Sequence, residues 1–212
     1  MAEEIDGRPV LLFASAPEWE TWLAAQPADS AGLWLKLAKK GCATPSIDYG
    51  TAVESALCFG WIDSQLRSYD ESFYLQRFTP RKPRSKWSQT NRDRVAALLA
   101  AGRMRPAGLR EVELAQADGR WEAAYAGQAS MPVPPDLQAA LDADPRAAEF
   151  FAALDSANRF AVLYRVDEAK RADTRARRIE RYVAMLHEHE TIHPRRPKKA
   201  GAEERSKSKE QP

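Results

Sequence analysis

The hydrophobic pattern divides the chain into a mixed N-terminal part and a helical C-terminal part. Within the segment Gly32 to Lys40, every second residue from Leu33 to Leu37 is a leucine, which predicts a strand with one buried face. Two further β-rich runs, at 61–68 and 73–78, enclose a short polar turn and predict a hairpin. Together they predict an α+β fold with a small antiparallel three-stranded sheet covered by helices, followed by a helical C-terminal region.

Apolar residues recur at three- and four-residue spacing between capping and stop signals, which predicts helices on both sides of the strands. Asp48 can cap a helix from Tyr49 to Phe59, and Gly60 after it is a typical stop signal. The other helices of the N-terminal part are expected from Ser15 to Gln26, after Ser85 or Ser88 up to Gly102, and from Pro106 to Gly119. In the C-terminal part, helices are expected from Pro135 to Leu141 and after Asp144, Ser156 and Asp173.

Changes in composition mark the boundaries of these parts. Three prolines between Ser130 and Pro135 indicate a linker. Residues 195–212 carry seven basic and three acidic residues and no large apolar one, which is typical of disorder. The expected organisation is a flexible acidic N-terminus at 1–14, an α+β domain at 15–129, a Pro-rich linker at 130–136, a helical region at 137–194 and a disordered basic tail at 195–212.

The composition is that of a globular protein, because 44% of the 212 residues are hydrophobic and 29% are charged. No apolar run approaches the roughly 18 residues that a membrane-spanning helix needs, and the acidic start is no signal peptide. Two cysteines, Cys42 and Cys58, do not make a disulfide framework. We therefore expect a cytoplasmic protein that does not insert into membranes.

The small net charge of +2 hides an uneven distribution along the chain. Residues 1–29 contain six acids and a single Arg, whereas residues 77–105 contain nine Arg or Lys and a single acid. Such a bipolar chain can steer an anionic partner to one face or pair its own two ends. The simpler alternative is a solvated loop and helix face.

Two motifs of catalytic type are better explained as structural residues. His189 to His193 has the H-E-x-x-H spacing of zinc proteases, in which both histidines lie one helical turn apart. Because Pro194 and the basic tail follow directly, we interpret it as a polar helix end whose histidines favour the C-terminal dipole. Cys58 has no histidine near it in sequence and follows apolar neighbours, which indicates a core residue. No metal site and no cofactor is expected.

The best functional candidate is the basic, proline-punctuated loop that follows the hairpin. Its charges and hydroxyls could hold a phosphate at a helix N-terminus, and its tryptophan offers a stacking face. The alternative is a scaffold in which Arg–carboxylate pairs hold the loop and the tryptophan packs in the core. The candidate ligand- or partner-binding residues are Asp63, Arg77, Thr79, Arg81, Lys82, Ser85, Trp87, Ser88 and Asn91.

Asp63 belongs to this set because it follows Trp61 at the start of a predicted strand. It could be a structural strut paired with an Arg of the basic loop, or a general base whose pKa is tuned by its surroundings. No second catalytic group is identifiable in the sequence. We therefore assign no catalytic residue and prefer the interpretation as a strut.

Several stretches of the chain form a specific combination: Ala56–Ser64, Gln76–Lys82, Ser85–Ser88 with Asn91, Gly102–Gly108, and later Ala169-Lys170 and Thr174–Ile179. This combination resembles the YdeI/OmpD-associated family, whose members are often labelled bacteriocin-protection proteins. The likeness runs from about Trp19 to about His193. The resemblance implies a bacterial role in resistance to bacteriocins or antimicrobial peptides, in some members linked to an outer-membrane porin. It implies no catalytic mechanism.

Three functions remain open from the sequence. The first is a cytoplasmic, non-enzymatic stress-resistance protein whose basic loop binds an anionic small molecule or a protein partner. The second is an enzyme on a small anionic substrate that uses Asp63, Arg77, Arg81 or Lys82. The third is weak nucleic-acid binding through the basic segment and tail, against which stands the lack of a nucleic-acid module signature or a Gly-rich phosphate loop in the sequence.

Overall fold

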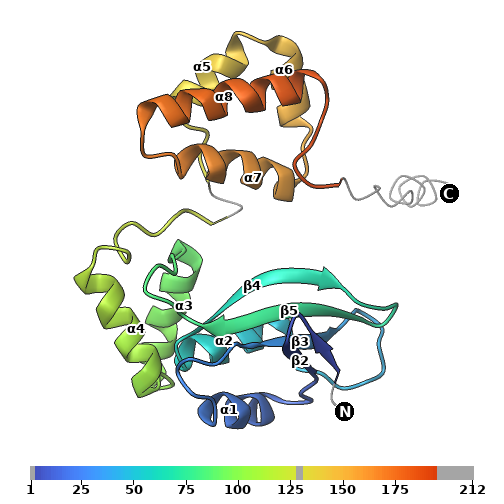
Figure 1. The fold of residues 1–212 in the computed structure, drawn as a ribbon, viewed down its shortest axis with the longest axis vertical. Coiled ribbons are helices and arrows are strands. Elements are labelled where there is room, and N and C mark those ends of the chain that lie inside the picture. Colours follow the sequence, from blue (N-terminus) through green and yellow to red (C-terminus); the bar gives the residue numbers. More distant parts are fainter. Residues whose placement is uncertain (1–2, 128–130, 195–212) are drawn as a thin grey trace, which may run out of the picture. The chain divides into compact units, whose positions relative to one another are not determined.

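The protein consists of two compact units, each with its own set of elements (Figure 1). The computed structural model describes residues 3–127 and 131–194. The N-terminal unit extends to Ala126 and combines a sheet with helices, whereas the C-terminal unit begins at Gly127 and its described residues form helices and no strand. The predicted tail at 195–212 lies outside the described residues, as does Ser130 of the predicted linker.

A mixed five-stranded sheet forms the frame of the N-terminal unit. Its strand order is β1-β2-β3-β5-β4. Strands β2 and β3 are parallel, and all other neighbours are antiparallel. The strands are β1 (Glu4–Ile5), β2 (Arg8–Leu11), β3 (Leu33–Ala38), β4 (Trp61–Ser68) and β5 (Phe73–Pro80).

The predicted combination of helices and a sheet is confirmed, and the three predicted strands pair in antiparallel fashion, but the sheet has five strands and is mixed. The three predicted strands are present as β3, β5 and β4, but two more come from the segment that was expected to be a flexible N-terminus. β1 and β2 are joined through Asp6-Gly7, both in the left-handed region with φ of 53° and 68°. Asp-Gly is a typical two-residue hairpin turn, and this signal carries more information here than hydrophobic alternation in such short strands.

The parallel pairing of β2 with β3 follows from the helix α1 (Ala16–Ala24) between them. Parallel neighbours need a crossover connection, and a helix that packs back onto the sheet supplies it. The predicted helix start at Ser15 is confirmed, and Glu18 accepts hydrogen bonds from the Ala14 N–H and the Ser15 hydroxyl, while Ser15 itself caps no backbone N–H.

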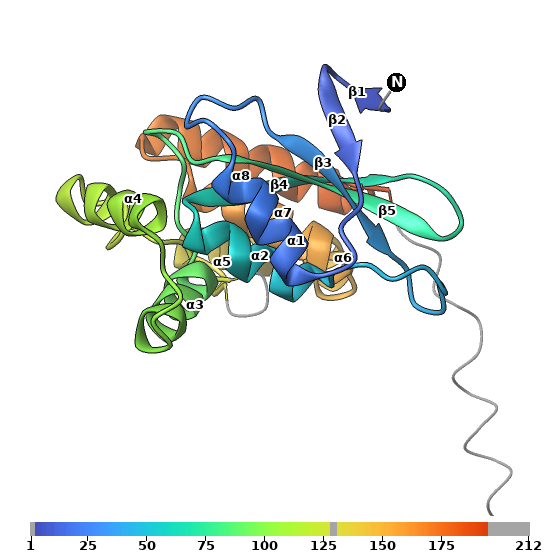
Figure 2. The same cartoon turned by 90° about the horizontal axis from the view of Figure 1, so that it is seen from below.

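Helices α1 and α2 (Tyr49–Cys58) cover one face of the sheet and bury its alternating leucines (Figure 2). Trp19 of α1 is fully buried, and its indole N–H donates to the Ala52 carbonyl of α2 at 3.1 Å. Around Trp19 lie the rings of Trp22, Trp61 and Phe78, with centroids 5.4–6.5 Å from its own. This aromatic cluster joins α1, α2 and the strands into one core.

Most of the predicted helix boundaries are confirmed by their caps. Asp48 accepts a hydrogen bond from the Thr51 N–H at 3.0 Å, and Ser88 accepts one from the Asn91 N–H at 3.1 Å. The latter begins α3 (Gln89–Ala100), and Pro106 is the first residue of α4 (Pro106–Ala117). Gly60 follows α2 with φ of 76°, a left-handed conformation that ends a helix at little cost only in glycine.

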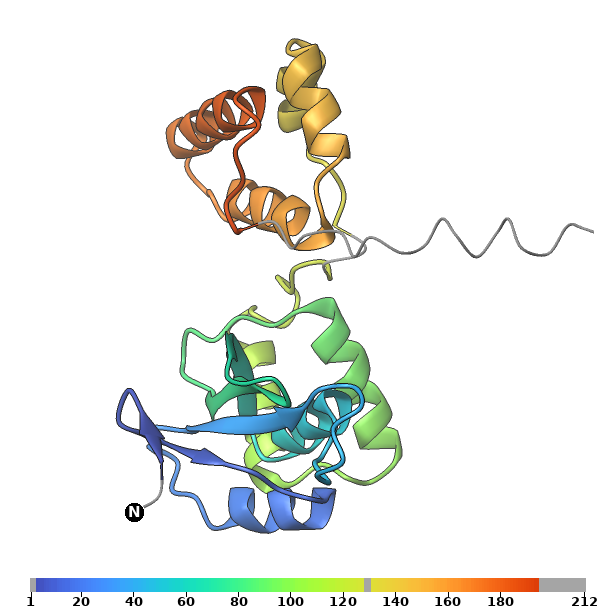
Figure 3. The ribbon, with the colours of Figure 1, turned by 90° about the vertical axis from the view of Figure 1, so that its right-hand side faces the viewer.

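In the C-terminal unit, the long helix α8 packs against the other three helices (Figure 3). Arg175 of α8 makes a bidentate pair with Asp136, with Nε–Oδ2 2.5 Å and Nη2–Oδ1 2.9 Å, and its Nη1 donates to the Val166 carbonyl. The pair and the third bond tie three helices together. The helices are α5 (Pro135–Asp142), α6 (Pro145–Ala152), α7 (Ser156–Asp167) and α8 (Ala172–His187).

Two predicted caps of this unit are shifted by one or two residues. Asp155, not Ser156, caps α7, accepting a hydrogen bond from the Asn158 N–H. Asp173 lies inside the first turn of α8, where its charge favours the helix dipole without capping a backbone N–H. None of the helices in the described ranges is both long and apolar enough to cross a membrane.

Candidate functional site

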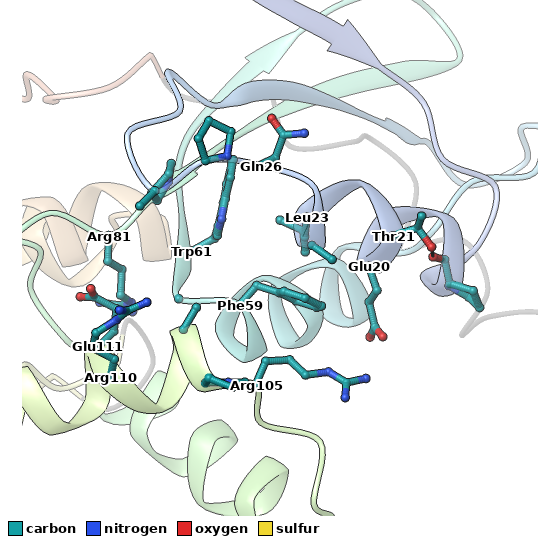
Figure 4. A pocket seen from close by; sticks show the side chains of 18 residues that line it. Glu20, Thr21, Leu23, Gln26, Phe59, Trp61, Arg81, Arg105, Arg110 and Glu111 are labelled. Carbon is teal, nitrogen blue, oxygen red and sulfur yellow. Dashed lines mark hydrogen bonds between the residues drawn. The ribbon is translucent and has the colours of Figure 1, made fainter.

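A groove of about 960 Å³ opens on the N-terminal unit where α1, the start of β4, the end of β5 and the start of α4 meet (Figure 4). The close-up shows Arg81, Arg110 and Glu111 together at one end, with Glu20 and Thr21 at the other. Trp61, Phe59 and Leu23 lie between these ends. The remaining lining residues are small or apolar ones and two further polar ones: Pro17, Ala24, Gln26, Pro27, Ala28, Gly60, Pro80, Arg105, Pro106 and Ala107.

Two glycines allow the first turn of α4 to approach the end of α2. A Cβ atom on Gly108 would lie 2.3 Å from the Cys58 carbonyl oxygen, and one on Gly60 would lie 3.0 Å from that of Ala107. The Arg105 N–H donates to the Cys58 carbonyl at 3.1 Å. The end of α2 and the start of α4 are thereby held together, which builds one wall of the groove.

Arg81 is the most unusual side chain of the groove because it is buried, with 7% of its surface exposed. Its backbone N–H donates to the Gly60 carbonyl at 2.9 Å, and its Nη1 donates to the Lys86 carbonyl at 3.2 Å. The guanidinium carbon lies 3.5 Å from the centre of the Trp87 ring. The other two nitrogens, Nε and Nη2, are buried without a hydrogen-bond partner among the described residues.

Burial lowers the pKa of Arg81 to about 10, an effect that the negative charge of Glu111 opposes. The side chain therefore stays charged at neutral pH, although its removal from water is costly. No ion pair involving Arg81 occurs in the described part of the chain. A charged guanidinium with two free donors is suited to hold an anionic oxygen, because its planar fork matches carboxylate and phosphate geometry.

Two packed tryptophan rings hold Arg81 in place from behind. Trp87, 2% exposed, packs edge-on against Trp121 with ring centroids 4.8 Å apart. Arg92 lies over the outer ring, 5.2 Å from its centre, and donates to the Trp121 carbonyl at 2.8 Å. Trp87 is thus a core residue that supports a cation, whereas the sequence left open whether it would offer a free stacking face.

The other candidate residues of the basic loop serve local structure or face solvent. The Ser85 hydroxyl accepts a hydrogen bond from the Lys82 N–H at 2.9 Å, which closes a turn. Ser88 and Asn91 form the α3 cap described above, and Lys82 is exposed. Of the predicted binding residues, Arg81 alone lines the groove.

The two candidates on β5 also lie away from the groove lining. Arg77 pairs with Trp34 across the strands, and its Nη1 donates to the Gln65 side chain at 3.3 Å. It lies on the sheet face opposite to that of Leu33 and Phe78, since side chains alternate along a strand. Thr79 lies beside Ile62 of β4 and packs close to Gly32.

Asp63 does not pair with an Arg of the basic loop, so the expected strut is wrong in its partner. Its carboxylate accepts a hydrogen bond from the Tyr49 hydroxyl at 2.7 Å and a long one from the Gln76 amide at 3.5 Å. Burial raises the pKa of Tyr49, and the neighbouring Asp63 charge raises it further. Asp63 therefore links β4 to the start of α2 through a hydroxyl.

The strongly basic segment at 77–105 does not form one continuous charged face. Arg81 is buried, and Arg92 is engaged with Trp121. Arg103 pairs with Glu54 at 3.0 Å and with Glu20 at 3.5 Å, which joins α2 and α1. Pairing between this segment and the acidic start of the chain is thus realised at Glu20.

Sequence reasoning missed the groove residues outside the basic loop, above all Glu20, Arg105, Arg110 and Glu111. Glu20 also accepts a hydrogen bond from the Ser55 hydroxyl at 2.7 Å. Pro106 at a predicted helix start, with Arg105 directly before it and Arg110 four residues after it, is the signal that could have drawn attention to the α4 residues. No local pattern indicates that this part of α4 lies beside Gly60.

The motifs interpreted as structural lie outside the groove. Helix α8 ends at His187, and His189 beyond it has φ of 58° and stacks on Phe150 with ring centroids 4.7 Å apart. The H-E-x-x-H residues are thus not one helical turn apart, and the described residues include no group of three or more metal-ligating side chains. Cys58 is 2% exposed, and burial raises the pKa of its thiol, as expected of a core cysteine.

Two family models match the chain over separate segments. Residues 130–189 match the family described as "Bacteriocin-protection, YdeI or OmpD-Associated". Residues 11–111 match a "Domain of unknown function (DUF8412)". The resemblance to the YdeI/OmpD-associated family is therefore confirmed for the C-terminal segment, whereas the stretches between Ala56 and Gly108 fall within the second match. All residues that line the groove belong to this second match.

Searches among curated proteins and among solved structures gave no match.

Proposed function

We propose that this protein is a non-enzymatic binding protein whose N-terminal unit holds an anionic group in the groove at Arg81. The observation that carries the proposal is the pair of buried guanidinium nitrogens that have no partner among the described residues. Buried polar groups in folded proteins are almost always hydrogen-bonded, and exceptions tend to have a functional reason. Both nitrogens are covered by neighbouring atoms, so in this proposal an anionic oxygen at the Arg81 end of the groove displaces that cover and supplies the missing bonds.

The composition of the lining supports binding over catalysis. The described residues that line the groove include no histidine, cysteine, serine or lysine. The one hydroxyl of the lining, that of Thr21, donates to the Pro17 carbonyl at 2.7 Å and not to a base. Of the residues that the sequence suggested as a base or nucleophile, Asp63 is hydrogen-bonded to Tyr49 and Cys58 is buried in the core.

The biological role belongs to the same proposal. The description of the family matched by residues 130–189 supports a part in bacterial resistance to bacteriocins or antimicrobial peptides. In this proposal the protein acts in the cytoplasm, and ligand binding at Arg81 sets whether it can engage a partner. Fractionation of cells that produce the full chain tests the location.

Thermal unfolding of the full chain with a panel of anions tests the binding function. An anion present at about 100 times its Kd adds about 2.7 kcal/mol of stability and raises Tm by several degrees. Arg81→Lys keeps the charge but loses the fork, so the shift should disappear. The Tm of Arg84→Lys, a change on the exposed part of the same loop, should rise with the anion as much as that of the parent chain does. Equal shifts in both variants would overturn the proposal.

A survival assay tests the resistance role separately. Cells that produce the parent chain or Arg84→Lys should survive a bacteriocin challenge better than cells with an empty vector, and Arg81→Lys should give no protection. Full protection by the Arg81→Lys variant would show that resistance does not depend on the groove. No protection by the parent chain would exclude the resistance role.

A further inference from the structure

We infer that the ligand of the groove is a small amphipathic carboxylate, with one carboxylate group on a flat apolar body. The inference rests on the proposed anion-binding function and goes beyond it by naming the class of ligand. It follows from three features of the groove: where the free donors lie, what lies between its ends, and how its charges balance.

The free donors lie at one end and are of two kinds. Nε and Nη2 of Arg81 supply the first. The first turn of α4 supplies the second. Pro106 has no N–H and the Arg105 N–H donates to the Cys58 carbonyl, so the early N–H groups without an acceptor within the helix are those of Ala107 and Gly108, and Arg105 provides no side-chain cap. Gly60 brings the two together, since its carbonyl accepts from the Arg81 N–H and the Ala107 carbonyl of this turn lies where a Cβ on Gly60 would come within 3.0 Å of it.

The floor between the two ends is apolar, with Trp61, Phe59 and Leu23, and the polar side chains Gln26 and Arg105 lie at its margins (Figure 4). A ligand that extends from Arg81 along this floor meets aromatic and aliphatic carbon, where an additional charge away from the margins would be desolvated. The body of the ligand should therefore be flat and apolar, and its anionic group terminal.

The charges of the lining balance to a single excess positive charge, from three arginines and two glutamates. Glu111 is the acid that most strongly influences Arg81. A dianion such as phosphate, and still more a polyphosphate, would be repelled by Glu111 at the same place. A carboxylate carries one charge and two coplanar oxygens, which suits one guanidinium fork.

Binding of indole-3-acetate to the full chain, measured by isothermal titration and by the shift in Tm, tests the inference. Indole-3-acetamide has the same body without the charge, and inorganic phosphate and ATP carry charge without this body. Indole-3-acetate should bind at least about tenfold more tightly than each of the other three, because a charged hydrogen bond is lost in the amide and the apolar contacts are lost in the phosphates. Arg81→Lys should weaken it by about tenfold or more.

Glu111→Gln supplies a variant that leaves Arg81 in place. Removing the competing negative charge should tighten indole-3-acetate binding several-fold, whereas Glu113→Gln, exposed on the same helix, should leave it unchanged. A merely structural Arg81 predicts no change in either variant. Arg81-dependent binding of phosphate or ATP without binding of indole-3-acetate would overturn the ligand class and keep the proposed function. Failure of every anion to bind would overturn both.

Discussion

Arginines a few residues apart have entirely different surroundings in this protein. Arg81 is buried on a tryptophan with two free nitrogens, Arg84 is exposed, and Arg92 is engaged with the Trp121 carbonyl. In the amino-acid composition, these three residues are simply three positive charges. Their energetic consequences differ because only the buried guanidinium has lost its water without gaining a full set of partners. At the residue scale, burial and pairing separate a candidate site from a solvated surface.

Gly108→Ala should destabilise the N-terminal unit more than a typical glycine substitution in a helix. The new Cβ would lie 2.3 Å from the Cys58 carbonyl oxygen, so α4 must move away from the end of α2. Overpacking of this kind costs about 1–3 kcal/mol or more. Denaturant unfolding measures the loss, and Gly50→Ala in the first turn of α2 is the control, since its Cβ approaches only the Asp48 side chain, at 3.2 Å. Similar effects of both substitutions would contradict the tight contact.

Asp144→Ala should lower stability at neutral pH and have less effect in acid. The hydrogen bond from the Ala147 N–H, followed by His187, holds the pKa of Asp144 below its ordinary value of 3.8. Because the pKa is lower in the folded state, the charged carboxylate stabilises the fold at pH values above its ordinary pKa. This contribution is lost as the pH falls through the lowered pKa of the folded state. Unfolding at pH 7 and at pH 3 measures it, with exposed Glu180→Ala as the control. An effect of Asp144→Ala that is equally large at both pH values would be evidence against the linkage.

At the scale of elements, local signals determine where helices begin and end, whereas long-range pairing determines how the strands assemble into the sheet. Caps at Asp48 and Ser88 and the stop at Gly60 place the ends of α2 and α3 with groups that lie within a few residues. Strands β1 and β2 are too short for an alternating pattern to emerge. They pair with each other across the Asp6-Gly7 turn, but β2 joins the sheet through β3, which lies more than twenty residues further along the chain.

Gly7→Ala should weaken the β1–β2 hairpin through its backbone alone. Gly7 has φ of 68°, and a Cβ there would meet no atom within 4 Å, so no clash contributes. The left-handed conformation costs a residue with a Cβ about 1–2 kcal/mol, and asparagine tolerates it better. Hydrogen exchange of the β1 and β2 amides should therefore accelerate in Gly7→Ala and less in Gly7→Asn. Equal protection in the two variants would mean that the turn does not limit hairpin stability.

At the scale of the whole molecule, the chain is two compact units with different architectures. The groove is lined only by residues between Pro17 and Glu111, and the core around Trp19 contains residues of the N-terminal unit alone. The C-terminal unit has its own tie between α5, α7 and α8 at Arg175. Each unit thus contains the contacts that its own fold needs.

A fragment of residues 1–126 should fold alone and keep the ligand site. A domain of this size can bury enough apolar surface to be stable, and all groove residues are included. Circular dichroism should show a cooperative unfolding transition, and binding of the best anion from the panel should match that of the full chain within about twofold. A folded fragment with much weaker binding would show that the C-terminal unit contributes to the site.

Much of the secondary structure was determined by the sequence alone, because helix caps, glycine stops and the β4–β5 hairpin depend on groups close together along the chain. The leucines of β3 likewise predicted the face that α1 and α2 bury, whereas the burial of Trp34 on the opposite face, against Val10 and Leu75, was not predicted. The sheet order, the attachment of the β1–β2 hairpin to β3 and the position of α4 beside α2 were decided only by the tertiary structure. These features depend on partners far apart in sequence, whose pairing no local pattern encodes.

The same reason governs the candidate site. The sequence indicated the basic loop that contains Arg81 but could not distinguish Arg81 from its neighbours. That distinction arises when Trp87 packs beneath the guanidinium and Gly60 brings α4 alongside it. Desolvation depends on everything that surrounds a side chain in three dimensions, so the assembled fold decides which charge becomes a buried, unpaired donor.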